Sequence, residues 1–229
     1  MNYVFFFIFL VFLFALYGFI HSVVASEKVK VYFKKIFGKL IAFYRLLYNV
    51  FALVGLYFIW ELAPHPSLQI YKLPPPYDYL VLIPQFISLV GMLWCFKYIC
   101  FKEFVGLNQV DRYLRNEYSD KDLDENYTLR IEGPYKYSRH PIYFFSIIFL
   151  LFRAEMSLFY LTMFISFTAY FYIGSYYEEK KMVRLFGDDY RDYQKKVPRI
   201  FPYKISHQSL AVIPARQESK MLVRKNTEF

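Results

Sequence analysis

Two polar segments carry the side chains whose types and spacing could support chemistry. The first is GPYKYSRHPIY, residues 133–143, which precedes an apolar run. Pro141 is at a favoured first position of a helix, where free backbone N–H groups attract an anionic group. Arg139 and His140 add cationic donors there, and Tyr135 and Tyr143 add aromatic faces. This mixture suits a cofactor that carries a carboxylate, a ribose and an adenine.

The second segment, YYEEKKMVRLFGDDYRDYQKKVPRIFP, follows another apolar run and opens with Glu178 and Glu179. Carboxylates near the end of a membrane helix are costly unless they are paired or functional. One of them would hold the ammonium group or the ribose hydroxyls of the same cofactor. Two plainer interpretations stay open. The first segment is also typical of an aromatic belt at headgroup level, and the second of a solvated charged helix face.

The elements that must position these segments are apolar. Hydrophobic residues make up 57% of the 229 residues and aromatic residues 23%. A membrane helix needs roughly 20 such residues. The sequence predicts an all-α integral membrane bundle of about five transmembrane helices with a cytoplasmic C-terminal helical cap. The apolar runs are Val4–Ile20, Ile41–Leu62, Tyr79–Phe101, Pro141–Phe152 and Met156–Tyr177.

The fourth run is too short to cross the hydrocarbon core unaided. We expect either that the preceding turn dips into the membrane or that neighbouring helices shelter this helix. Only Arg153–Glu155 separates it from the fifth run, which predicts a tight antiparallel hairpin. We also expect an ordered loop over the proline-rich connector Leu73–Asp78, and close helix packing at Gly91.

Lysine and arginine gather in the segments after the first, third and fifth runs, whereas the other two loops hold one each, Lys72 and Arg153. The positive-inside rule therefore predicts a multi-pass protein with its N-terminus outside and its C-terminus cytoplasmic. The net charge of +9 is then a feature that faces anionic lipid and indicates no nucleic-acid partner. A cleaved signal peptide is the rival interpretation of the first run, but that run is long and no Lys or Arg precedes it.

The pairing of GPYKYSRHPIY with EEKKMVRLFGDDYRDYQKKVPRIFP resembles the membrane methyltransferase superfamily, which includes isoprenylcysteine carboxyl, phospholipid and methanethiol S-methyltransferases. The match covers about the last 100 residues up to Pro202. Three earlier stretches look like the bacterial methanethiol methyltransferase branch and its relatives described as nitric-oxide-reductase accessory proteins. These stretches are His21-Ser22, residues 44–49 and residues 103–109. We accordingly expect one methyltransferase domain over 1–203, with its cofactor half at about 130–203, and a polar flexible tail over 204–229.

The resemblance implies S-adenosyl-L-methionine as cofactor and transfer of its methyl group to a small thiol or a lipophilic acceptor. It implies cofactor contacts from Tyr135, His140, Pro141, Ile142, Tyr143 and Glu178, to which the residue types add Arg139 and Glu179. Isoprenylcysteine enzymes carry an arginine where this chain has Gly174, which favours a smaller, uncharged or thiol acceptor.

His21, Arg45 and Asn49 are the candidates for catalytic side chains, because they would face the site from across the bundle. The chain shows no metal-binding motif, so we expect no metal ion. Alternative functions are an isoprenylcysteine carboxyl or phospholipid methyltransferase, and, in another class, a non-catalytic membrane accessory protein. The residues leave the oligomeric state open.

Overall fold

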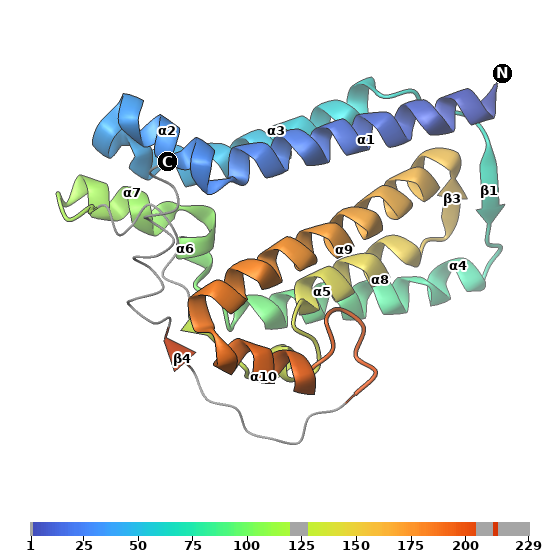
Figure 1. Ribbon diagram of the computed structural model, residues 1–229. Helices are drawn as coiled ribbons and strands as arrows, with labels where there is room; N and C mark the ends of the chain where they lie inside the picture. Colours follow the sequence, from blue (N-terminus) through green and yellow to red (C-terminus); the bar gives the residue numbers. More distant parts are fainter. Residues whose placement is uncertain (1, 120–127, 205–212, 215–229) are drawn as a thin grey trace.

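The computed structural model describes residues 2–119, 128–204 and 213–214, which form a bundle of long helices (Figure 1). Its helices are α1 (Tyr3–Ala25), α2 (Glu27–Phe37), η1 (Gly38–Phe43), α3 (Tyr44–Leu62), α4 (Tyr77–Leu80), α5 (Leu82–Phe96), α6 (Phe101–Val105), α7 (Leu107–Leu114), η3 (Gly133–Lys136), α8 (Pro141–Leu151), α9 (Leu158–Phe186) and α10 (Asp188–Lys196). Its short strands are β1 (Gln69–Lys72), β2 (Thr128–Leu129), β3 (Glu155–Ser157) and β4 (Ile213–Pro214). The predicted all-α class is confirmed.

The long helices form one series of neighbours. Helix α3 packs on α1, α1 on α9, α9 on α8, and α8 on α5 (Figure 1). Because α9 lies between α1 and α8, its side chains reach both the α1–α3 half and the α5–α8 half of the bundle. This position makes α9 the element on which a site between the halves depends.

Four stretches of the described chain are long and apolar enough to cross a membrane, namely Tyr3–Ala25, Glu27–Leu62, Tyr77–Phe96 and Leu158–Phe186. The fourth predicted run forms α8, whose 11 residues extend about 16 Å at ~1.5 Å per residue. That is roughly half of the ~30 Å hydrocarbon core. Helix α8 is packed between α5 and α9, so neighbouring helices do shelter it.

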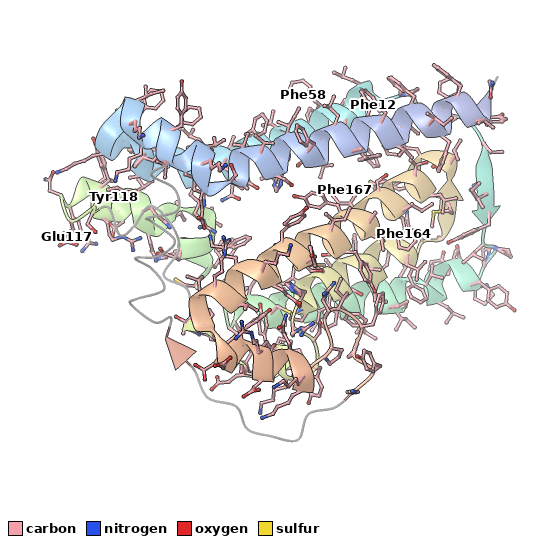
Figure 2. All side chains as sticks on the ribbon, viewed as in Figure 1. Phe12, Phe58, Glu117, Tyr118, Phe164 and Phe167 are labelled. Carbon is pink, nitrogen blue, oxygen red and sulfur yellow. The ribbon has the colours of Figure 1, made fainter. Side chains whose placement is uncertain are left out.

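The outer surface of the bundle is apolar. Phe12 and Phe58 lie on the outside of α1 and α3, exposed by 58% and 52%, whereas Phe167 lies between α1 and α9 (Figure 2). Exposed apolar patches of this extent mark contact with a partner or a membrane. Together with the lengths of the spans, they indicate a multi-pass membrane protein.

Some helix boundaries differ from those predicted. Helix α9 continues nine residues beyond Tyr177, to Phe186. The reason is that its last turn buries Leu185 and Phe186 against Tyr190 and Tyr193 of α10. The basic stretch after the first run forms α2, and the third run ends as a helix at Phe96 rather than Phe101.

The connection between α8 and α9 is more than a turn. Strand β3 pairs antiparallel with β1, with Tyr71 opposite Met156 and Lys72 opposite Glu155. Lys72 and Glu155 also form an ion pair. This ribbon joins the α3–α4 connector to the α8–α9 connection. The predicted loop Leu73–Asp78 is partly helical, because α4 begins at Tyr77.

Glycines allow the helices to approach closely. A Cβ atom on Gly91 of α5 would overlap the Phe145 ring of α8, so the predicted close packing there is confirmed. On α1, a Cβ atom on Gly18 would lie 3.0 Å from the Tyr170 ring of α9. The predicted flexible tail, 204–229, lies outside the described residues except for 204 and 213–214.

Candidate functional site

The corner before α8 is fixed by a glycine and by the chain after α10. Gly133 has a φ of +54°, and a Cβ atom there would overlap the Tyr98 ring, so both the backbone and the space favour glycine. The Arg139 N–H then donates to the Pro198 carbonyl and the His140 N–H to the Arg199 carbonyl, both at 3.0 Å. The corner is thus held by the segment that follows α10.

Two further hydrogen bonds tighten this corner. The Ser138 hydroxyl donates to the Arg199 carbonyl over 3.2 Å, and the Tyr193 hydroxyl of α10 donates to the Tyr135 carbonyl over 2.6 Å. Burial raises the pKa of Tyr193 well above its ordinary value, so its hydroxyl stays protonated as the donor. Helix α10 therefore closes over the corner from outside the bundle.

Glu179 is the buried carboxylate of the site. Its residue is 3% exposed, and its Oε1 lies 2.9 Å from Arg139 Nε. Its Oε2 accepts from Gln194 Nε2 over 2.9 Å and lies 3.4 Å from Arg199 Nε. A buried carboxylate is tolerated only with such partners. Glu179 therefore joins the corner, α10 and the following segment.

Glu178 is placed differently. Its side chain is 48% exposed, and its Oε2 lies 3.2 Å from His140 Nδ1. Its other oxygen accepts a hydrogen bond from the Tyr143 hydroxyl. Helical neighbours are rotated by about 100° from each other, so Glu178 and Glu179 point in different directions. Glu178 keeps exposed surface, whereas Glu179 is enclosed by protein.

His140 lies between both carboxylates, since its Nε2 is 3.4 Å from Glu179 Oε1. Burial of the ring acts to lower its pKa, but the carboxylates of Glu178 and Glu179 beside it act in the opposite direction. The pKa of His140 is raised above its ordinary value as a result. A protonated ring here would stabilise both carboxylates.

An aromatic stack extends from this charged group into the bundle. The Tyr143 ring is parallel to His140 within 5°, with ring centres 5.3 Å apart. Its other neighbour is Phe171 of α9, stacked at 4.7 Å. Stacked electron-rich faces next to a carboxylate favour a cationic ligand.

A second polar group lies around Tyr170 of α9, two turns before Glu178 on that helix. His21 Nδ1 is 2.7 Å from the Tyr170 hydroxyl, and His21 Nε2 is 2.6 Å from the Tyr48 hydroxyl. Ser22 Oγ also lies 3.2 Å from the Tyr170 hydroxyl. Helices α1, α3 and α9 each supply one member of this histidine–tyrosine group, defined as His21, Tyr48 and Tyr170.

Gly174 separates the two polar groups along α9. Tyr170, Gly174 and Glu178 are spaced by four residues and so share one face of the helix. A Cβ atom on Gly174 would meet no other atom within 4 Å. The space beside α9 is therefore open between the histidine–tyrosine group and Glu178.

The other two catalytic candidates have backbone partners. Arg45 Nε donates to the Phe104 carbonyl over 2.7 Å, and Asn49 Nδ2 donates to the Val105 carbonyl over 3.0 Å. These carbonyls end helix α6, where backbone acceptors lack helical partners. In the structure, both side chains fasten α6 to α3.

The structure thus brings Tyr135, Arg139, His140, Pro141, Ile142, Tyr143, Glu178 and Glu179 to one end of the bundle. It places His21 in a separate group and Arg45 and Asn49 at α6. Sequence reasoning missed Gln194, Arg199, Tyr48 and Tyr170. Tyr170, Gly174 and Glu178 follow one another at four-residue intervals, and this spacing was the one signal that would have found Tyr170. Among the described residues, no three His, Cys, Asp or Glu side chains form a metal-binding group.

An apolar helical bundle with a charged, aromatic-lined corner at one end defines an integral membrane protein. The chain matches no family model, and it matches no solved structure. It does match three named proteins. Methanethiol S-methyltransferase 1 of Bradyrhizobium diazoefficiens is 30% identical over 200 residues, which are 85% of this chain and 66% of that protein.

The methanethiol S-methyltransferases of Pseudomonas deceptionensis and Crocosphaera subtropica are 29% and 26% identical, over 84% and 80% of this chain and 71% and 69% of those proteins. The chain spans about two thirds of the length of these relatives. It belongs to the methanethiol S-methyltransferase-like family of membrane methyltransferases.

Proposed function

We propose that the protein is a membrane methyltransferase that uses S-adenosyl-L-methionine to methylate a small thiol of the methanethiol type. The relatives are named for this acceptor. The observation that carries the proposal is the contact of Glu178 with His140 and Tyr143 at one corner. Glu178 lies at least 35 residues from both of them along the chain.

The chemistry of this corner fits the proposed cofactor. Four of its buried polar atoms, Arg139 Nε, His140 Nε2, Glu179 Oε1 and Arg199 Nε, make no hydrogen bond within the described residues. Each of the three nitrogens lies 2.9–3.4 Å from a carboxylate oxygen of Glu179, so these groups attract one another while hydrogen-bonding capacity remains. Such unsatisfied groups are rare in buried positions and need an explanation. A polar ligand that completes them is that explanation.

Each end of the cofactor has a matching group on the chain. The half-exposed Glu178 would hold the ammonium group or the ribose hydroxyls. The start of α8 would receive the carboxylate through the free backbone N–H groups of Ile142 and Tyr143, while Pro141 fixes the first turn and donates no hydrogen bond. The stacked rings of Tyr143 and Phe171 would lie beside the sulfonium. Arg139 and Glu179 act as positioning residues, because they bind the corner to the segment after α10.

S-adenosyl-L-methionine supplies an activated methyl group when it is bound. The chain has to hold the acceptor in line with that group, and alignment accounts for much of the rate in such reactions. We place the acceptor thiol beside Gly174, between the histidine–tyrosine group and Glu178. Thiols react as thiolates. His21 would take the thiol proton at whichever ring nitrogen is not already protonated.

The position of the membrane supports the same scheme. The polar corner and the basic segments after α1, α5 and α9 lie at one end of the bundle (Figure 1), which we assign to the cytoplasm by the positive-inside rule. The N-terminus then lies outside. The cofactor half, 130–203, would face the water-soluble cofactor, and a lipophilic acceptor would arrive from the bilayer.

The experiment is methyl transfer from radiolabelled S-adenosyl-L-methionine by the purified protein in vesicles, offered methanethiol, a prenylcysteine and phosphatidylethanolamine separately. We expect label on methanethiol. Label on the prenylcysteine or the lipid alone would assign one of the alternative acceptor classes instead. If no acceptor is labelled and S-adenosylhomocysteine fails to raise the unfolding temperature, the protein is a non-catalytic member of the family.

A further inference from the structure

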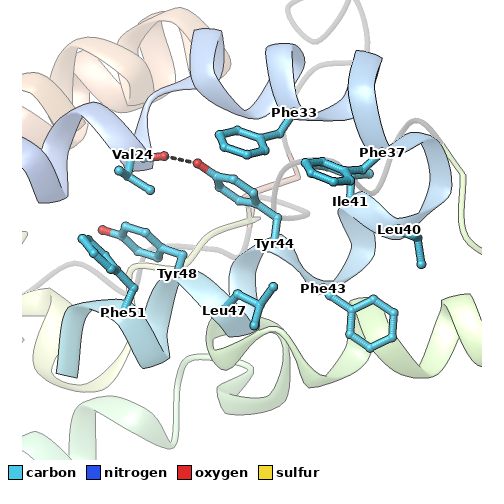
Figure 3. A pocket seen from close by; sticks show the side chains of 10 residues that line it. All are labelled: Val24, Phe33, Phe37, Leu40, Ile41, Phe43, Tyr44, Leu47, Tyr48 and Phe51. Atoms are coloured by element: carbon cyan, nitrogen blue, oxygen red, sulfur yellow. Dashed lines mark hydrogen bonds between the residues drawn. The ribbon is translucent and has the colours of Figure 1, made fainter. Parts of the chain in front are cut away.

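An apolar cavity of about 470 Å³ lies away from the polar corner, where α2, η1 and α3 fold back on each other (Figure 3). Gly38, with a φ of +57°, allows the chain to reverse there. The Tyr44 hydroxyl donates to the Val24 carbonyl and ties α3 to the end of α1 (Figure 3). The cavity is lined by Val24, Phe33, Phe37, Leu40, Tyr44 and Leu47, among others.

The size and lining of this cavity suit a flexible apolar chain. Its volume is within the ~300–1,000 Å³ of small-molecule sites, and the side chains around it are aliphatic or aromatic. Leu47 is 63% exposed and Leu40 is 52% exposed, so the cavity opens to the outside of the bundle. In a membrane protein this opening faces lipid.

Positive charge surrounds the cavity. Helix α2 and the start of η1 carry Lys28, Lys30, Lys34, Lys35 and Lys39. Lys30 and Lys34 precede the cavity-lining Phe33 and Phe37 by three residues, so the four share one side of α2. Both lysines are half-buried, whereas Lys28 and Lys35 are exposed. Glu27 at the start of α2 forms an ion pair with Lys181 of α9 at 2.9 Å.

We propose that this cavity binds one anionic phospholipid, with an acyl chain between α2 and α3 and the phosphate beside Lys30 and Lys34. Amphipathic helices with clustered lysines attract anionic headgroups, and each lysine near the surface adds to the attraction. The apolar cavity supplies what a charged surface alone lacks, namely a place for the chain. The cavity adjoins the histidine–tyrosine group at Tyr48, which lines the cavity and contacts His21. The lipid proposal rests on the apolar lining and on α2, so it does not depend on methyl transfer.

The test is photo-cross-linking of the purified full chain in detergent with phosphatidylglycerol that carries a diazirine on its acyl chain. We expect adducts within residues 33–51, displaced by unlabelled phosphatidylglycerol but not by phosphatidylcholine. Leu47→Trp fills the cavity and should lower the yield of adduct about tenfold, because several buried methylene groups lose their place. Leu53→Trp is the matched control, since Leu53 is equally outward on α3, at 71% exposure, and should leave the yield unchanged.

The headgroup is tested by charge removal on opposite sides of α2. Lys30→Gln with Lys34→Gln should weaken displacement by phosphatidylglycerol about tenfold, whereas Lys28→Gln with Lys35→Gln should change it little. The unfolding temperature without lipid shows whether each pair still folds normally. Adducts spread evenly over the spans, equal loss in both pairs, or displacement by decanethiol but not by phosphatidylglycerol would each overturn the proposal.

Discussion

Replacing each of two adjacent carboxylates by its amide separates a ligand role from a folding role. Glu179 is 3% exposed and lies at ion-pair or hydrogen-bond distance from Arg139, Gln194 and Arg199. Breaking a buried ion pair costs about 3–5 kcal/mol, because the remaining charge is left uncompensated. Glu179→Gln leaves the buried Arg139 in that condition and should lower the unfolding temperature markedly.

Glu178→Gln should weaken ligand binding and leave the unfolding temperature nearly unchanged. Its side chain is 48% exposed, and pairs this exposed contribute about 0–1 kcal/mol to stability. A hydrogen bond from a ligand's charged group is worth about 1.5–3 kcal/mol. We therefore expect near-normal unfolding but a dissociation constant for S-adenosylhomocysteine raised about 10- to 100-fold.

The assay is calorimetry of purified protein in one detergent, with thermal unfolding and ligand titration on the same preparations. Glu61→Gln is the matched control, because Glu61 is an exposed glutamate at the far end of α3. The reasoning is refuted if Glu178→Gln binds as tightly as the wild type, or if Glu179→Gln unfolds at the wild-type temperature.

Three further predictions concern the space on α9 and the two histidines. Gly174→Leu should reduce methanethiol methylation, because the leucine fills the open space beside the helix. Ala169→Leu, on the exposed side of α9, is the control and should not reduce it. Equal rates for both variants would contradict the acceptor position. The raised pKa of His140 means that its ion pairs stabilise the fold fully below about pH 6.5, the pKa in an unfolded chain, and that this stability is lost as the pH rises through the folded pKa. The unfolding temperature of the wild type should then approach that of His140→Gln in alkaline buffer, and a constant gap between them counts against the assignment. His21→Gln should lose methyl transfer at neutral pH and regain it as the thiol ionises unaided, a recovery visible in initial rates against pH and absent if His21 is only structural.

The membrane helices and the meeting of the two polar segments were predictable from the sequence. Apolar runs are local signals, and the short connection between the fourth and fifth runs returns the chain to the side it left. Residues 133–143 and Glu178 therefore had to lie at the same end of the bundle. The structure confirms this proximity through the contact of His140 with Glu178.

The difference between the half-exposed Glu178 and the buried Glu179 was not predictable. It depends on the rotation of α9 about its axis and on Gln194 and Arg199, which approach only after α10 folds back. Helix α2 was also missed as a helix, because its alternating lysines resemble a basic connector. Phe33 and Phe37 face their partners in α3 only in the folded chain.

The β1–β3 ribbon determines how the bundle can widen. It pairs the α3–α4 connection with the α8–α9 connection at the end remote from the corner. Glu178 lies 20 residues beyond the start of α9, about 30 Å along the helix axis. A small angular movement about this ribbon is magnified over that distance. Such a movement would therefore separate the helices most at the end that carries Glu178 and least at the paired strands.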